Sequence, residues 1–376
     1  MSPVRFLVAP QSKRDELVSL FFLGHLCSMK ITKPKFVRNE QALSLSLVRQ
    51  LAGRRFVILT DEIVAEHCMP LLAVFLQNHQ PLDIIEVEPG EVSKSPEVCI
   101  QLWDHFIELG LNKTDVVVCL GGGSVCDLGG FVAKTYKRGI PVLFLPTTLL
   151  AMTDASIGGK NGVDSLDVKN VIGTISQPEA ILVYPSFYET LTRRQYVSGL
   201  AEVVKHAVIS GGELWNDVKT MLSNEHSISL EILKRSAEFK YSIVKQDPFE
   251  KDLRRILNFG HTIGHAIESA CMNRADQLEH GIAVAAGMLV ETELAIRLKL
   301  GEKKELDEVK EFIRSGFQDY WIEMPRWNEI SPFLEQDKKI KAKKNVFALP
   351  FSIGRLEIVE QVPVGDVEKA YNQFFS

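Results

Sequence analysis

The chain has 376 residues, of which 45% are hydrophobic and 24% are charged, and its formal net charge is −5. This length allows two domains with separate cores, and the composition is ordinary for a globular protein. The acidic balance argues against nucleic acid as a general partner. No apolar run is long enough to span a bilayer, so we expect no membrane-spanning segment.

The longest early apolar stretch, 17–27, follows Asp15 and Glu16, whereas a signal peptide carries positive charge at that point. We interpret the stretch as an early folded element of unspecified type. The chain has neither a Cys-x-x-Cys pair nor disulfide-like spacing, which is typical of reduced, buried thiols in a cytoplasmic protein. Its six cysteines are Cys27, Cys68, Cys99, Cys119, Cys126 and Cys271.

Up to about residue 185, short β-branched runs alternate with segments of helical periodicity such as 96–109. Near-continuous apolar runs of this kind are typical of a parallel sheet that is buried on both faces. The clearest predicted strands are 55–60, 115–120, 141–146 and 180–183. The alternation predicts a doubly wound, Rossmann-like α/β domain over residues 1–185.

From residue 186 onward the pattern becomes helical, which predicts a second, helical domain over 186–376. A pair of strand-like pieces, 345–349 and 355–359, precedes a C-terminal helix. The predicted amphipathic helices are 193–222, 228–245, 260–272, 281–299 and 303–315. We expect the active site in the cleft between the two domains.

The run Asn258–Glu268 places His261 and His265 four residues apart, on one face of a helix. Two glycines in the same run predict that another backbone approaches this helix closely. With His280 and Glu202, the histidines supply the nitrogen and oxygen ligands of a catalytic zinc site with one open position. The alternative is two hydrogen-bonded histidines on a half-buried helix. The spacing does not indicate which three of the four groups would bind a metal.

The strand 115–120 runs into the glycine-rich turn 121–130, where backbone N–H groups at a helix start could bind a phosphate. The spacing differs from the Gly-x-Gly-x-x-Gly fingerprint, so a tight turn with nothing bound is the alternative. The loops 89–94 and 146–148 are candidates to close over a nucleotide. Asp61, at the end of an earlier strand, is a candidate acceptor for a ribose hydroxyl.

The loop 154–162 contains adjacent glycines and is followed by Lys169 and Asn170, which predicts a mobile or closely approached loop near positive charge. Further cationic or amide donors belong to neighbouring motifs: Arg138, Lys205, Lys240, Arg254 and Asn258. Taken singly, each lysine is ordinarily a solvated surface charge. Together, in an acidic protein, these groups indicate an anionic small-molecule substrate.

The motifs as a set resemble those of the 3-dehydroquinate synthase family of sugar-phosphate cyclases, in order, from about residue 55 to the end. The matching motifs are Gly-Gly-Gly-x-x-x-Asp at 121–127, Pro-Thr-Thr-Leu-Leu-Ala at 146–151, Asp-x-Ser-x-Gly-Gly-Lys at 154–160, Lys-Asn at 169–170, Gly-Leu-Ala-Glu-Val-Val-Lys at 199–205, Asn-x-Gly-His-Thr-x-Gly-His-Ala-Ile-Glu at 258–268, His-Gly at 280–281 and Asp-Lys-Lys at 337–339.

The resemblance implies an NAD-binding N-terminal domain, a helical domain that holds Zn²⁺, with Co²⁺ as the alternative metal, and a homodimer. It also implies a carbon–oxygen phospho-lyase of the shikimate pathway, which converts 3-deoxy-D-arabino-heptulosonate 7-phosphate to 3-dehydroquinate and phosphate. In that scheme NAD oxidises a ring alcohol transiently, phosphate is eliminated, the hydride returns and an aldol step closes the ring. The alternatives are a related sugar-phosphate cyclase and a glycerol-phosphate dehydrogenase.

The resemblance also implies roles for individual residues. The metal ligands would be Glu202, His261 and His280, with His265 as a substrate or proton-relay residue beside them. The expected substrate contacts are Lys160, Asn170, Lys205, Lys240, Arg254, Asn258 and Lys338, with Arg138 reaching across the dimer interface. The expected NAD contacts are Asp61, Gly90, Glu91, Lys94, Gly122, Gly123, Asp127, Thr147, Thr148, Asp154, Lys160, Lys169, Phe187 and Thr190.

Three positions depart from the family pattern. Val168 and Asp252 stand where a glycine is usual, and Ile282 stands where an acidic residue is usual. None of these changes removes an expected ligand, so we expect activity. They predict altered loop conformations near Lys169 and Arg254.

Overall fold

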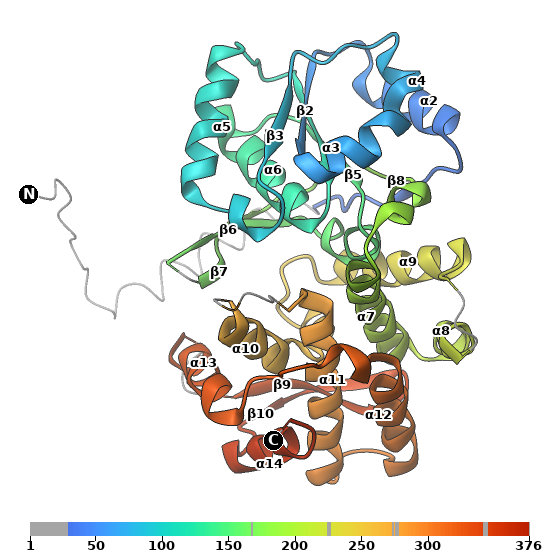
Figure 1. The fold of residues 1–376 in the computed structure, drawn as a ribbon, viewed down its shortest axis with the longest axis vertical. Helices are drawn as coiled ribbons and strands as arrows, with labels where there is room; N and C mark the ends of the chain where they lie inside the picture. The colour runs from blue at the N-terminus through green and yellow to red at the C-terminus, as the bar shows by residue number, and fades with distance from the viewer. Residues whose placement is uncertain are drawn as a thin grey trace, which may run out of the picture. The chain divides into compact units, whose positions relative to one another are not determined.

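A six-stranded, all-parallel sheet with the strand order β1-β8-β5-β4-β2-β3 forms the N-terminal part of the structure (Figure 1). The computed structural model describes residues 29–375 except 167, 224–226, 273, 275–277 and 341–344, and it leaves the side chains of 335–340 undescribed. The predicted element at 17–27 lies outside the described residues. Residues from Ile31 to the C-terminus form one compact unit, and the predicted domain boundary at 185 stays a prediction.

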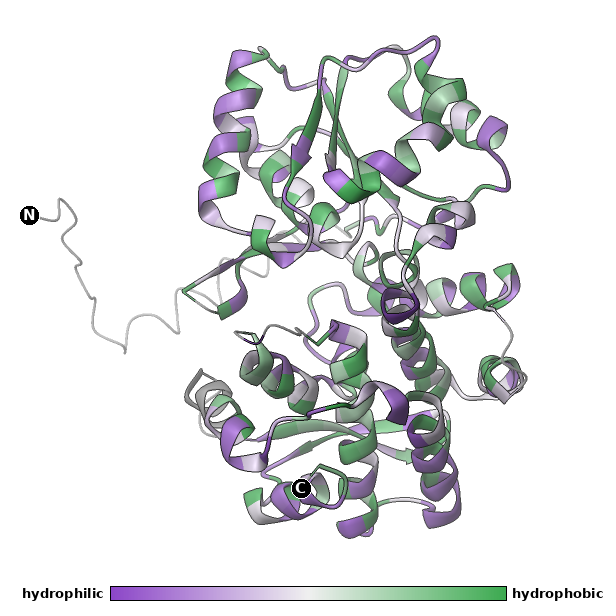
Figure 2. Cartoon of the chain, in the orientation of Figure 1, coloured by the Kyte–Doolittle hydropathy of each residue, from purple (hydrophilic) through white to green (hydrophobic). Residues whose placement is uncertain are grey.

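The four predicted strands are confirmed within one residue at either end. The sheet strands are β1 (Lys35–Phe36), β2 (Phe56–Asp61), β3 (Ile84–Val87), β4 (Val116–Gly121), β5 (Val142–Pro146) and β8 (Ala180–Val183). Every residue of β2, β4, β5 and β8 is buried, and Figure 2 shows the central strands as mainly hydrophobic. Strands covered on both faces retain apolar side chains at every position, which explains why their sequence pattern was clear.

Helices cover both faces of the sheet. Figure 1 shows α5 and α6 on one side and α2, α3 and α4 on the other. These helices are α2 (Glu40–Leu51), α3 (Glu62–Cys68), α4 (Ala73–Leu76), α5 (Pro96–Glu108) and α6 (Gly123–Thr135). The predicted helix 96–109 corresponds to α5, which begins with Ser95 accepting a hydrogen bond from the Val98 amide. The doubly wound α/β prediction is therefore confirmed.

An antiparallel hairpin of β6 (Lys160–Ser165) and β7 (Val168–Ile175) follows β5. It is preceded by η5 (Ala151–Ala155), a short π-helical turn, and by Gly158 and Gly159, whose φ angles are 118° and 67°. A Cβ on Gly158 would lie 2.4 Å from the Arg254 guanidinium. The glycines are therefore closely approached, as predicted, because only glycine fits both that contact and that backbone.

The C-terminal part is mainly helical, as predicted. Its elements are α7 (Arg193–Ser210), α8 (Gly212–Ser223), α9 (Leu230–Gln246), α10 (His261–Cys271), α11 (His280–Arg297), α12 (Lys303–Phe317), α13 (Trp327–Ile340), β9 (Val346–Ser352), β10 (Arg355–Glu360) and α14 (Val364–Asn372). The single helix predicted over 193–222 is wrong, because Gly211 adopts a φ of 63° and separates α7 from α8. Among the described residues, no helix is long and apolar enough to cross a membrane.

The five described cysteines are free and buried, in agreement with the predicted thiols. The helices α10 and α11 pack through glycine. A Cβ on Gly287 would lie 1.9 Å from the carbonyl oxygen of Gly260, and one on Gly264 would lie 3.1 Å from the Cα of Val284. The close backbone approach predicted from the glycines of the histidine motif is therefore confirmed, and it positions the two helices that begin with His261 and His280.

We predict that Gly287→Ala lowers the free energy of unfolding by ~2 kcal/mol or more, since the added methyl group must displace the Gly260 backbone. Urea unfolding followed by circular dichroism measures the change. The control is Gly316→Ala in α12, where the nearest heavy atom to the new Cβ, on Leu222, lies 4.0 Å away. That variant should gain up to ~1 kcal/mol of helix propensity. Equal stability of the two variants would contradict the packing analysis.

Candidate metal and cofactor site

Three predicted metal ligands from three helices converge at one point. Glu202 lies on α7, and His261 and His280 are the first residues of α10 and α11. The Oε1 atom of Glu202 is 3.8 Å from Nε2 of His261 and 3.7 Å from Nε2 of His280. Two ligands held ~2 Å from one ion lie ~3–4 Å apart, so these distances suit a shared metal ion.

The carboxylate of Glu202 is buried. Its Oε2 forms an ion pair with Nζ of Lys205, one turn further along α7. Its Oε1 faces the two Nε2 atoms and has no hydrogen bond among the described residues. A buried carboxylate oxygen without a donor is costly. The donor set therefore fits a divalent metal ion.

Both histidines present Nε2 to Glu202. The Nδ1 atom of His261 lies 3.2 Å from the Phe259 carbonyl, which can only accept, so the proton belongs on Nδ1. Nδ1 of His280 lies 3.0 Å from Oε2 of Glu268. Burial and the nearby Lys205 charge hold the pKa of His261 well below its usual range. The ring is thus neutral near pH 7, as a metal ligand must be.

Glu268 contacts the metal group through Nδ1 of His280. It was not among the predicted site residues. It is buried and accepts a hydrogen bond of 3.0 Å from Nζ of Lys169 on β7, in addition to its contact with His280. Although burial opposes ionisation, His280 and Lys169 keep the pKa of Glu268 well below its usual range. Only the motif Gly-His-Ala-Ile-Glu drew attention to this residue in the sequence.

His265 lies beside the metal group. Its ring centroid is 5.2 Å from that of His261 and 5.9 Å from that of His280. A second set of potential ligands comprises His265, Glu268 and His280. The side chain of His265 is exposed, and its role as a substrate or proton-relay residue stays a prediction.

Asp154 gathers several of the predicted cationic residues. Its Oδ2 is 2.6 Å from Nζ of Lys240, and its Oδ1 is 3.6 Å from Nζ of Lys205 and 3.1 Å from Nε2 of His206. Both lysines are buried. Burial opposes ionisation of Asp154, but the two lysines lower its pKa well below the usual range. Because Lys205 also pairs with Glu202, the cationic cluster adjoins the metal group directly.

Arg254 is buried, and its Nη1 donates to the carbonyl oxygens of Pro248 (2.9 Å) and Gly158 (3.3 Å). Two further predicted substrate contacts, Lys160 and Asn258, meet at Glu250. Lys160 forms an ion pair with Glu250, and Nδ2 of Asn258 donates to Oε1 of Glu250 at 2.7 Å.

Sequence analysis missed Glu250, which has a left-handed φ of 56°. Its only signal was its place between Lys240 and Arg254 in the chain.

The three departures from the family pattern are accommodated. Val168 is the first residue of β7 and pairs with Ser165, an extended position that does not require glycine. Asp252 has a φ of −137°, and its amide donates to Asp247. Ile282 is buried within α11.

Lys94 contacts two other residues that are predicted to bind NAD, Asp127 and Glu91. Its buried Nζ lies 2.9 Å from Oδ2 of Asp127, 2.8 Å from Oδ1 of Asn170 and 3.3 Å from Oε2 of Glu91. Burial opposes the charge, yet Asp127 and Glu91 raise the pKa of Lys94. Asn170, assigned to the substrate by resemblance, thus lies among the residues assigned to NAD.

The start of α6 fits a phosphate group. Its N-cap is Gly122, and no side chain caps the helix, so the first N–H groups remain available. A Cβ on Gly122 would lie 3.1 Å from Thr148, and one on Gly123 would lie 3.1 Å from Ala155. The buried Oγ1 of Thr147 has no hydrogen-bond partner among the described residues. An unpaired hydroxyl beside an uncapped helix start is suited to a bound dinucleotide.

The remaining predicted cofactor residues follow the carboxyl ends of parallel strands, where such sheets bind ligands. Asp61 ends β2 and caps α3 by accepting from the Val64 amide at 2.9 Å. Gly90, with a φ of 86°, follows β3. Phe187 and Thr190 lie in η6 (Pro185–Thr190), directly after β8.

Two predicted residues have no described contact with these groups. Arg138 is exposed in η4 (Tyr136–Arg138), with a left-handed φ of 65° and no hydrogen bond or ion pair to any described residue. Lys338 lies in α13, and its side chain is outside the described part of the chain.

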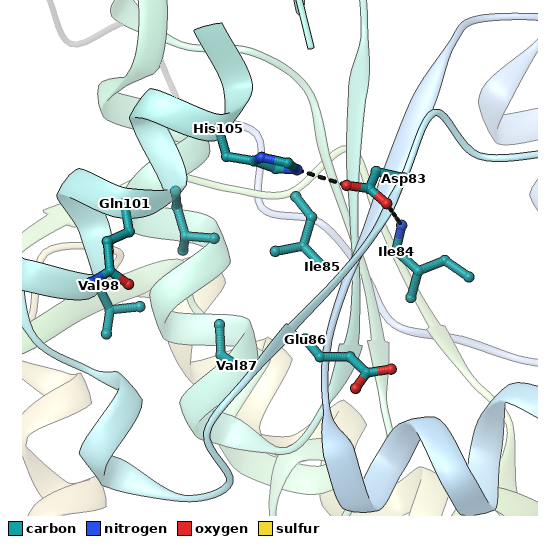
Figure 3. Close-up of a pocket in the computed structure, with 9 residues that line it drawn as sticks. Asp83, Ile84, Ile85, Glu86, Val87, Val98, Gln101 and His105 are labelled. Carbon is teal, nitrogen blue, oxygen red and sulfur yellow. Dashed lines mark hydrogen bonds and ion pairs between the residues drawn. The ribbon is translucent and has the colours of Figure 1, made fainter. Parts of the chain in front are cut away.

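The open groove in Figure 3 is separate from these groups. It lies between β3 and α5, is crossed by a 2.7 Å contact between His105 and Asp83, and is lined by none of the predicted site residues.

We predict that His261→Ala removes the bound divalent metal, because two ligands from Glu202 and His280 hold an ion far less tightly than three. Metal content after dialysis against zinc, measured by mass spectrometry, tests this. His79→Ala is the control, since His79 stacks on Phe75 and belongs to none of the potential ligand groups found in the described part of the chain. Stoichiometric zinc in the His261 variant would refute the assignment.

The chain is similar to known proteins over most of its length. Residues 84–198 match the family model for the 3-dehydroquinate synthase N-terminal domain, and residues 199–340 match that for the C-terminal domain. A 2-epi-valiolone synthase from Actinosynnema mirum is 38% identical over 334 residues, which cover 86% of this chain and 87% of that protein. A 3-dehydroquinate synthase from Streptococcus pyogenes serotype M18 is 38% identical over 304 residues, or 80% of this chain and 84% of that protein.

A solved structure extends the comparison. The 2-epi-5-epi-valiolone synthase of Streptomyces hygroscopicus subsp. jinggangensis, solved with NAD⁺ and Zn²⁺ bound, aligns with a TM-score of 0.81 and 25% identity. The alignment covers 93% of this chain and 99% of that one. The chain therefore belongs to the 3-dehydroquinate synthase family of sugar-phosphate cyclases.

Proposed function

We propose that the chain is a 3-dehydroquinate synthase, which converts 3-deoxy-D-arabino-heptulosonate 7-phosphate to 3-dehydroquinate and phosphate. The proposal rests on the position of Lys205. This residue forms ion pairs both with Glu202 of the metal group and with Asp154 of the cationic cluster. A substrate with both a carboxylate and a phosphate needs several cations beside the metal, and Lys205, Lys240 and Arg254 are buried here.

We propose NAD and Zn²⁺ as the cofactors, with Co²⁺ as a possible replacement. The Streptomyces relative was solved with NAD⁺ and Zn²⁺, and both groups fit donors of this chain. Thr147 and the uncapped start of α6 suit a dinucleotide, and Glu202 with the Nε2 atoms of two histidines suits the metal. When bound, the metal lowers the pKa of a coordinated hydroxyl and NAD accepts and returns a hydride.

The residues of the chain then have distinct tasks. Lys205, Lys240 and Arg254 hold the anionic groups of the substrate, while Glu268 keeps His280 oriented through Nδ1. His265, exposed beside the metal group, is placed to move a proton between substrate and solvent.

In a homodimer, Arg138, which has no hydrogen bond or ion pair among the described residues, would reach the substrate phosphate of the partner subunit. Its left-handed backbone is a conformation that persists mainly where the surroundings or a function require it.

A second candidate is a cyclase of the 2-epi-valiolone synthase kind. It is favoured by the Actinosynnema mirum relative, which matches a larger share of this chain than the Streptococcus pyogenes enzyme at the same identity. A ketose phosphate without a carboxylate would need no partner for Arg254. The buried guanidinium of Arg254 therefore favours the first candidate. A glycerol-phosphate dehydrogenase would need neither a carboxylate partner nor so many buried cations.

Purified protein mixed with the heptulosonate 7-phosphate, zinc and a trace of NAD tests the proposal. We expect phosphate and dehydroquinate to form in large excess over NAD, and a chelator to abolish both. Phosphate release only from a ketose phosphate without a carboxylate would instead establish the second candidate. Net NADH formation from a polyol phosphate, without phosphate release, would identify a dehydrogenase.

We predict that Arg254→Ala raises KM for the carboxylated substrate by ~10–100-fold, the effect of losing a charge-assisted hydrogen bond. The dissociation constant of NAD should change little. Arg235→Ala is the matched control, since Arg235 on α9 pairs with Asp217 away from the cluster. Arg254→Lys should retain part of the affinity. An unchanged KM in Arg254→Ala would mean that Arg254 only supports the loops at Gly158 and Pro248.

A further inference from the structure

A continuous chain of contacts connects the hairpin strand β7 to the metal group. Nζ of Lys169 lies 3.0 Å from Oε1 of Glu268, and Oε2 of Glu268 lies 3.0 Å from Nδ1 of His280. The opposite side of that ring, Nε2, lies 3.7 Å from Glu202. Each carboxylate oxygen of Glu268 therefore serves one partner, Lys169 or the histidine.

Asn170, the next residue of β7, contacts the residues that are predicted to bind NAD. Oδ1 of Asn170 accepts a hydrogen bond of 2.8 Å from Lys94, which also contacts Asp127 and Glu91. Lys169 and Asn170, although adjacent in the chain, reach two different groups. Asn170 has a φ of 52°, a conformation that asparagine tolerates well, and its amide is held by Asp164 at 2.6 Å.

We propose that Lys169, Asn170 and Glu268 couple dinucleotide binding to metal binding, with Glu268 as the positioning residue for His280. This deepens the proposed function, since it takes NAD and a divalent metal as the two ligands. A dinucleotide beside Lys94 and Asn170 fixes β7, and β7 then presents Lys169 to Glu268. The His280 ring then loses its conformational entropy only once for both ligands. Binding of either ligand therefore increases the affinity for the other.

Zinc affinity, measured by competition with a chromophoric chelator with and without saturating NAD, tests the coupling without any substrate. In the unaltered protein we expect NAD to tighten zinc binding at least ~5-fold. Lys169→Met should abolish this difference, and Lys169→Arg, which keeps the cation, should restore it. Glu268→Gln should weaken zinc binding ~10–100-fold under both conditions.

The chain offers a closely matched control pair. Glu293, 5% exposed on α11, pairs with Lys310 at 3.2 Å, much as Glu268, 6% exposed, pairs with Lys169. Glu293→Gln and Lys310→Met should leave zinc affinity and its dependence on NAD unchanged. Because Lys169 is 30% exposed, its variants should fold even if Glu268→Gln does not.

Equal zinc affinity with and without NAD in the unaltered protein would overturn the proposal. Coupling that persists in Lys169→Met, or zinc binding of unaltered strength in a folded Glu268→Gln variant, would overturn it as well. Failure of the proposed function is distinguishable, since it would appear as absent phosphate release from a protein whose zinc and NAD affinities remain coupled.

Discussion

The buried carboxylate of Glu202 is the constraint on which the rest of the site depends. Its Oε2 forms an ion pair with Lys205, whereas its Oε1 faces two histidine nitrogens and has no hydrogen bond among the described residues. A buried carboxylate oxygen without a donor is costly. A metal ion between Glu202, His261 and His280 would satisfy this oxygen, and Lys205 also contacts Asp154 of the cationic cluster.

The packing of α10 against α11 positions the two histidines that face Glu202. Glycine contacts bring the backbones of α10 and α11 together, and Glu291 on α11 accepts hydrogen bonds from the amides of Gly260 (2.6 Å) and Ile263 (3.3 Å). Burial raises the pKa of Glu291 to about 8, although the hydrogen bonds from these amides oppose that rise. Each of its two oxygens accepts from one amide at the start of α10. His261 therefore begins a helix whose start is held from the neighbouring helix.

Much of the fold could be predicted from the sequence because β2, β4, β5 and β8 are buried on both faces and therefore apolar throughout. The edge strands β1 and β3 were not predicted, since they are short and partly exposed. The site residues could be grouped by motif, but the choice among the four ligand candidates depends on how three helices cross. Glu250 and Glu268 escaped functional assignment because their partners, Lys160 and Lys169, are distant in the chain.

Anomalous X-ray diffraction at the zinc edge, from crystals grown with zinc, is the sharpest test of the metal site. We expect one strong peak within coordination distance of Glu202 and of the Nε2 atoms of His261 and His280. A peak at the alternative group of His265 and Glu268, or no peak beside Glu202 in zinc-loaded crystals, would contradict it.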